Sequence, residues 1–110
     1  MNAAVILLAI VTFSKGHYTV DHYPLQTKPW IESIEYSEKE KGQVFLNLKD
    51  SSFKATPDCK WRPLNADSAT VGNLTYYSKN KLKFAFFEKD KKKKYVPQDL
   101  AFILSCKLKS

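Results

Sequence analysis

The densest group of like-charged side chains in this chain is a lysine run in its last third. Five lysines surround a single aspartate, Asp90: Lys89, Lys91, Lys92, Lys93 and Lys94. Closely spaced ammonium groups attract polyanions such as sulfated glycans, anionic lipids, nucleic acids or an acidic protein face. The alternative is a solvated loop whose charges discourage aggregation at a sheet edge. These five lysines are the candidate residues for binding a polyanion or another partner.

The positive charge of the whole chain comes from the same region. The formal net charge is +7, and residues 79–110 carry ten lysines against three acidic residues. The chain has seventeen lysines, and Arg62 is its single arginine. Arginine is the side chain suited to paired hydrogen bonds with phosphates and base edges. The composition therefore favours diffuse, salt-sensitive attraction to polyanions over sequence-specific recognition of nucleic acid.

Residues for acid–base catalysis are few. A small secreted ribonuclease needs a histidine, a carboxylate and a basic residue that converge on a phosphate. His22, Glu88 and Arg62 supply these types, but nothing in their spacing brings them together. The sequence contains no nucleophile elbow, phosphate loop or calcium loop. We expect binding without catalysis, with a ribonuclease-like enzyme or an RNA-binding pseudoenzyme as the alternative.

Two histidines near the start of the chain raise the question of a metal site. His17 and His22 lie beside Tyr18 and Tyr23, with Asp21 between them. If His17 became the first residue of a processed chain, its amine and its ring could both bind copper. No third histidine or free thiol completes a closed site. We expect surface residues on a loosely held arm, with no metal and no other cofactor.

Two cysteines and one sequon are candidate sites for two modifications of the secretory pathway, a disulfide and a glycan. Cys59 and Cys106 are the only cysteines, and an isolated pair forms one disulfide in an oxidising compartment. Closing the long loop between them contributes about 4 kcal/mol in the chain-entropy account. The alternative, a free nucleophilic thiol, needs a nearby base and a reducing environment. Asn73-Leu74-Thr75 is the only sequon, so Asn73 is the candidate glycosylation site.

The first sixteen residues bear on the compartment. Residues 3–13 are apolar apart from Thr12, and no charged side chain precedes Lys15. These eleven residues would span about 16 Å as a helix, which is too short for a hydrocarbon core of about 30 Å but suits a secretory signal peptide. We predict a signal peptide at 1–16 and a secreted, extracellular domain at 17–110 without a transmembrane segment. The alternative is a buried first strand or helix of the folded domain.

Downstream of an arm at 17–29, apolar residues alternate with a period of two in short runs. The alternation predicts six strands, at residues 30–36, 43–49, 59–64, 74–77, 82–87 and 100–108. Polar loops are expected at 65–72 and 89–97, and no helix is needed. This pattern indicates an all-β fold, a small antiparallel β-sandwich or barrel of about six strands with one disulfide. The disulfide would tie the third of these strands to the last, across the core.

Adjacent aromatic residues suggest a second binding surface. Tyr76-Tyr77 and Phe86-Phe87 place one ring of each pair on each face of a strand. The outward rings lie beside lysines, which suits a protein-binding patch, unless a second layer covers both faces.

The overall plan of signal peptide, small β domain and single bridge is similar to secreted effectors of fungal pathogens, viral immune modulators and arthropod salivary proteins, although no motif is shared. We therefore expect a secreted basic binding protein, a host-directed effector or defence modulator whose partner is a host or target protein. A membrane-active toxin that uses its lysines on anionic lipid is a further alternative.

Overall fold

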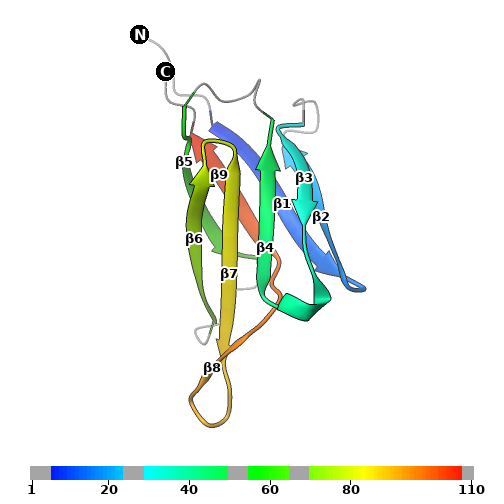
Figure 1. Cartoon of the computed structure of the whole chain (residues 1–110), viewed down its shortest axis with the longest axis vertical. Helices are drawn as coiled ribbons and strands as arrows, with labels where there is room; N and C mark the ends of the chain where they lie inside the picture. Colours follow the sequence, from blue (N-terminus) through cyan, green and yellow to red (C-terminus); the bar gives the residue numbers. More distant parts are fainter. Residues whose placement is uncertain (1–5, 24–28, 50–54, 65–69, 108–110) are drawn as a thin grey trace.

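Two antiparallel β-sheets packed face to face make up the fold (Figure 1). The structure is a computed structural model that describes residues 6–23, 29–49, 55–64 and 70–107. Sheet A has the strand order β2-β1-β9-β5, and sheet B has the order β3-β4-β7-β6 with β8 paired to β7. The strands are β1 (Ile6–Ser14), β2 (His17–Tyr23), β3 (Ile31–Glu35), β4 (Gln43–Leu48), β5 (Asp58–Pro63), β6 (Thr70–Ser78), β7 (Lys81–Lys89), β8 (Tyr95–Pro97) and β9 (Phe102–Lys107). One 3-10 helix, Glu38–Glu40, is the other regular element of the described ranges.

The expected all-β architecture is confirmed, and each of the six strands predicted from alternation is present with shifted ends. The polar loop expected at 65–72 is partly wrong, because β6 already begins at Thr70. The arm expected at 17–29 contains β2, and the basic loop expected at 89–97 contains β8. Both are edge or short strands that need only one partner, so their sequences carry little periodicity.

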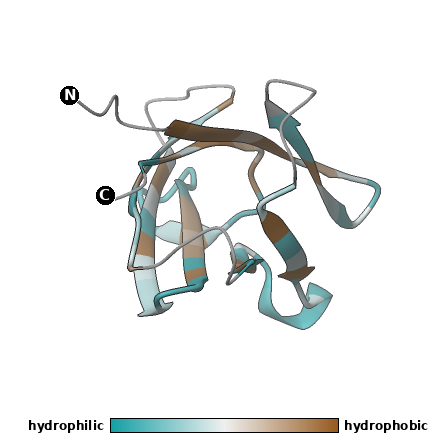
Figure 2. Cartoon of the chain, turned by 90° about the horizontal axis from the view of Figure 1, so that it is seen from above, coloured by the Kyte–Doolittle hydropathy of each residue, from teal (hydrophilic) through white to brown (hydrophobic). Residues whose placement is uncertain are grey.

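Strand β1 lies inside sheet A and has a partner on each side. Ile10 is paired with Asp21 of β2 on one side and with Ile103 of β9 on the other. Ala9 and Val11 point into the core and are fully buried. Figure 2 shows this apolar strand running across one layer of the sandwich. The apolar run that resembles a signal peptide is therefore a core strand of this fold.

Cleavage ahead of His17 stays a prediction, and the structure shows which strand pairings such a cleavage would remove. Removing residues 1–16 would take away β1, the strand to which β2 is paired along its whole length. It would also uncover the edge of β9. No helix in the described part of the chain is long and apolar enough to cross a membrane.

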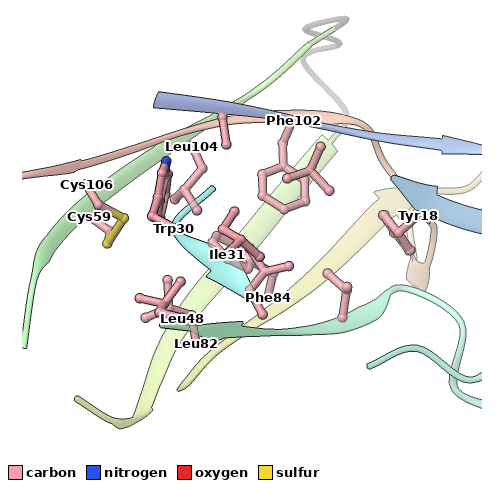
Figure 3. Packing of buried hydrophobic residues seen from close by; sticks show 14 of the residues in the cluster. Tyr18, Trp30, Ile31, Leu48, Cys59, Leu82, Phe84, Phe102, Leu104 and Cys106 are labelled. Carbon is pink, nitrogen blue, oxygen red and sulfur yellow. A yellow bond between two sulfur atoms is a disulfide. The ribbon is translucent and has the colours of Figure 1, made fainter. Parts of the chain in front are cut away.

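The core lies between the inner faces of the two sheets (Figure 3). Three phenylalanines are fully buried there: Phe84, Phe86 and Phe102. The Trp61 indole packs edge-on against all three rings, with centroid separations of 5.2–6.5 Å. Gly72 leaves room for this indole, because a Cβ atom at Gly72 would lie only 2.5 Å from it. Aromatic rings carry large buried areas, so this cluster dominates the packing of a small domain.

The disulfide between Cys59 and Cys106 is present, as predicted. The two residues face each other on the neighbouring strands β5 and β9, with their Cα atoms 4.0 Å apart. The expectation that the bond crosses the core is therefore wrong, because it joins two strands within sheet A. In Figure 3 the disulfide lies toward one end of the core and Tyr18 toward the other.

The position of β1 predicts that two neighbouring substitutions differ in effect. Ala9→Asp places an unpaired carboxylate in the core and should lower the free energy of unfolding by at least about 3 kcal/mol. Leu8→Asp changes an outward side chain that is 39 % exposed, and should cost about 1 kcal/mol or less. Urea unfolding of the full chain measures both values. Equal stabilities for both variants and the wild type would show that β1 is not part of the folded domain.

The disulfide gives a second prediction. Replacing Cys59 and Cys106 with serine should lower the melting temperature by at least about 15 degrees, because the closed loop contributes about 4 kcal/mol and each kcal/mol shifts a small domain by several degrees. Reduction of the wild type with dithiothreitol is the matched control and should give the same loss. A melting temperature that neither treatment changes would contradict the bridge.

Candidate functional site

The predicted lysine run forms the tip of a β-hairpin, here called the lysine hairpin (residues 87–97). Its arms are the end of β7 and the short β8, with Lys89 paired to Tyr95 and Phe87 paired to Pro97. Figure 1 shows that the hairpin extends from the sandwich at the end opposite the chain termini. All residues from Lys89 to Pro97 are exposed. The structure therefore gathers the five candidate lysines on one protruding element.

Asp90 shapes the turn of the lysine hairpin. Its Oδ1 atom accepts hydrogen bonds from the backbone amides of Lys92 and Lys94, at 2.8 and 2.9 Å. The Asp90 amide donates to the Lys94 carbonyl, and Lys93 takes a left-handed conformation with φ of 63°. An aspartate that binds backbone amides two and four residues ahead is a common way to close a turn. The one acidic residue of the run thus fixes the backbone that carries the lysines.

A second group of basic and aromatic side chains lies on the outer surface of sheet B. We call it the aromatic–lysine face, and it consists of Phe45, Tyr77, Lys81 and Lys83. The Phe45 and Tyr77 rings meet at a centroid distance of 5.3 Å. The Nζ atoms of Lys81 and Lys83 lie 5.1 and 5.7 Å from the Phe45 centroid, within the range of a cation–π contact. Three strands, β4, β6 and β7, therefore build one surface of rings and ammonium groups.

The aromatic pairs divide between the two faces as their alternation predicts. Phe86 is fully buried and Phe87 is half-buried on the opposite side of β7. Tyr77 is 56 % exposed, whereas the Tyr76 hydroxyl accepts a hydrogen bond from the Cys59 amide and so joins the two sheets. Phe45 is a member of the aromatic–lysine face that was not predicted, although its position between the inward Val44 and Leu46 indicates an outward ring.

A polar network holds one lysine of the aromatic–lysine face. The Lys81 Nζ atom forms a 2.8 Å ion pair with Glu35, and Asn47 donates to the same carboxylate. Asn47 also donates to Ser33. The hydrogen bond from Lys81, followed by that from Asn47, lowers the pKa of Glu35. Glu35 therefore stays ionised and orients Lys81 beside Phe45.

The candidate glycosylation site lies next to this surface. Asn73 is exposed on β6, at the edge of sheet B, and is paired with Ala85. Thr75 of the same sequon is paired with Lys83. Use of the site stays a prediction. A glycan at Asn73 would share the outer surface of sheet B with the aromatic–lysine face.

The three residues considered for acid–base catalysis lie on three separate strands. His22 belongs to β2, at one edge of sheet A, and Arg62 belongs to β5, at the other edge. Three strand spacings of about 4.8 Å separate these edges. Glu88 is in β7 of sheet B. The described residues also contain no group of three or more histidine, cysteine, aspartate or glutamate side chains placed to hold a metal ion.

His22 has a structural role instead. Its Nε2 atom accepts a 3.2 Å hydrogen bond from the Ile31 amide, and its ring packs edge-on against Trp30 at 5.8 Å. Burial, with a smaller contribution from Lys49, lowers the pKa of His22. The neutral imidazole therefore connects β2 of sheet A to β3 of sheet B. This corrects the expectation of a loosely held surface residue.

Asp99 joins several segments where the lysine hairpin meets the sandwich, and no sequence motif marks it. Its carboxylate accepts hydrogen bonds from the hydroxyls of Tyr18 and Tyr36 and from the Gly42 amide. Burial and the hydrogen bond to Asp99 raise the pKa of Tyr36 to about 12. Burial, with the Asp99 charge as a smaller cause, also raises the pKa of Tyr18. Both hydroxyls remain protonated donors at neutral pH, which makes this cluster a structural clamp.

Comparison with known proteins adds no relative to this description. No protein-family model, no curated protein and no solved structure matches the chain. The lysine hairpin and the aromatic–lysine face are the surfaces of the described residues whose chemistry suits a ligand.

The lowered pKa of His22 predicts a loss of stability in mild acid. Protonation favours the unfolded chain, so the contribution of neutral His22 is present above the ordinary value of 6.5 and is lost as the pH falls through the lower folded value. Between pH 7.5 and 5, the melting temperature of the wild type should fall more than that of His22→Gln. His17→Gln, a change at an exposed position, should keep the wild-type slope. Parallel curves for the wild type and His22→Gln would contradict this role.

Proposed function

We propose that this protein is a non-catalytic binding module that attaches to polyanions through the lysine hairpin. The observation that carries the proposal is the concentration of Lys89, Lys91, Lys92, Lys93 and Lys94 on one exposed tip. Clustered charges on a protruding element raise the local concentration of oppositely charged ligands and speed their association. The hydrogen bonds of Asp90 fix the backbone in advance, which reduces the ordering cost of binding.

The proposal includes a location outside the reducing cytosol. Its support is the disulfide within sheet A, because such bonds persist in oxidising compartments. The disulfide supports a location outside the cytosol more strongly than the apolar N-terminal run does, because that run forms strand β1 of the fold. Within this proposal the protein acts on a molecule of a host or target cell, as an effector or defence modulator does.

Charge removal from the lysine hairpin tests the proposal. Replacing Lys91, Lys92, Lys93 and Lys94 with glutamine should shift elution from a heparin column to markedly lower salt, because each lost phosphate or sulfate contact reduces the salt dependence of binding. The melting temperature should change by only a degree or two, since these side chains are exposed.

The matched control has the same net charge but changes four exposed lysines elsewhere: Lys15, Lys39, Lys41 and Lys60. It should keep most of the wild-type retention. If the two variants elute together, net charge rather than the lysine hairpin governs binding. If neither variant shifts, the proposed function is wrong.

A further inference from the structure

We propose that the polyanion is a single-stranded nucleic acid, which lies across the outer surface of sheet B from the aromatic–lysine face to the lysine hairpin. This inference rests on the proposed function and adds a second recognised group, the unpaired base. It assigns the rings to the bases and the lysines to the phosphates. This combination is the usual chemistry of proteins that bind single strands without sequence preference.

The arrangement of side chains along β7 supports this path. Every second residue of the strand points away from the core, in the order Lys81, Lys83, Ala85, Phe87 and Lys89. The strand rises about 3.3 Å per residue, so these positions extend over about 26 Å. That length accommodates on the order of four to eight nucleotides. The last two of these positions, Phe87 and Lys89, belong to the lysine hairpin.

Aromatic rings stand at both ends of this path. Phe45 and Tyr77 form the pair at the aromatic–lysine face. Phe87 and the 55 % exposed Tyr95 lie at the lysine hairpin, where the Lys89 Nζ atom is 5.9 Å from the Tyr95 centroid. Phe45, Tyr77 and Tyr95 each have a lysine ammonium group within about 6 Å of the ring centroid, close enough to serve the phosphate beside a stacked base. Rings and ammonium groups therefore lie together at both ends of the path.

The lysines of the aromatic–lysine face also lie over its rings when no ligand is bound. The ammonium group of Lys83 lies 5.7 Å from the Phe45 centroid and 5.9 Å from the Tyr77 centroid. Cation–π contacts of this kind are weak at exposed positions. A phosphate can draw the ammonium group off the ring, and the uncovered ring can then stack on a base. One displacement thus supplies both contacts.

Single strands fit this surface better than duplexes do. In a duplex the bases already stack on one another, and their edges are read from a groove that a sheet face does not enter. The one arginine, Arg62, lies on β5 of sheet A and contributes nothing to base-edge recognition on sheet B. We therefore expect binding that depends on ring stacking and charge and that tolerates most sequences.

The test compares the rings with the charges. Fluorescence anisotropy of a labelled twelve-nucleotide single strand is measured with the full chain and with Phe45→Leu/Tyr77→Leu, which removes both ring faces but keeps apolar side chains under the lysines. We expect the double variant to bind the oligonucleotide at least about tenfold more weakly, since the loss of stacking on even one base has an effect of this size. Its retention on heparin, which has no bases, should stay at the wild-type value.

Three controls accompany the measurement. Ile6→Leu/Leu8→Ala changes exposed apolar residues on the outer surface of sheet A and should keep full affinity. Phe45→Tyr/Tyr77→Phe keeps both rings and should also keep it. The same sequence as a duplex should bind more weakly than the single strand at equal salt.

The outcomes separate this inference from the proposed function. Unchanged oligonucleotide affinity in Phe45→Leu/Tyr77→Leu, or a duplex that binds as tightly as the single strand, would overturn the inference while hairpin-dependent heparin binding stands. An equal loss on heparin and on the oligonucleotide would also overturn it, because the rings would then not act through bases. If heparin binding did not depend on the lysine hairpin, the proposed function itself would be wrong.

Discussion

The pairing of β1 with a strand on each side is the interaction on which sheet A depends. The backbone of Ile6–Ser14 is hydrogen-bonded to β2 along one edge and to β9 along the other. Its inward residues, Ala9 and Val11, complete the core beneath sheet B. Without this strand, β2 would lose its partner in the sheet and β9 would expose an unpaired edge, which invites association with other chains. The apolar segment that has the composition of a signal peptide is here the strand that joins β2 to β9 within sheet A.

The rest of the molecule consists of a packed β-sandwich and the lysine hairpin that projects from it. At one end, the Cys59–Cys106 bond fastens β5 to β9. Near the other end, Asp99 accepts hydrogen bonds from Tyr18, Tyr36 and Gly42, and the chain leaves the lysine hairpin just before Asp99. The clamp holds the base of the hairpin while its tip stays in solvent. Under the proposed function, a hairpin that projects from a well-packed sandwich can contact a large anionic ligand without any rearrangement of the core.

The alternating strands were predictable because each has one clearly apolar face. In β4 and β7, Val44, Leu46, Leu82 and Phe84 occupy every second position of their strands, and all four are fully buried. β2 and β8 were not predictable from alternation, because they are polar or short. Each is stabilised by pairing with one neighbouring strand that the local sequence does not indicate. The candidate site shows the same division. The lysines and the outward Tyr77 could be identified from local pattern, whereas the turn-forming bonds of Asp90 and the contact of Phe45 with Tyr77 join residues whose proximity is set by the fold.

By itself the sequence determined the all-β class, the inward side of the alternating strands, the position of the positive charge and the pairing of its only two cysteines. The tertiary structure decided that the disulfide lies within one sheet, that β1 is an internal strand, and that rings from β4 and β6 meet lysines of β7 on one surface. The physical reason is that alternation encodes only which face of a strand is apolar. The partner and the register of a strand are fixed by contacts with residues far away in the chain, and these contacts place the groups that could bind a ligand.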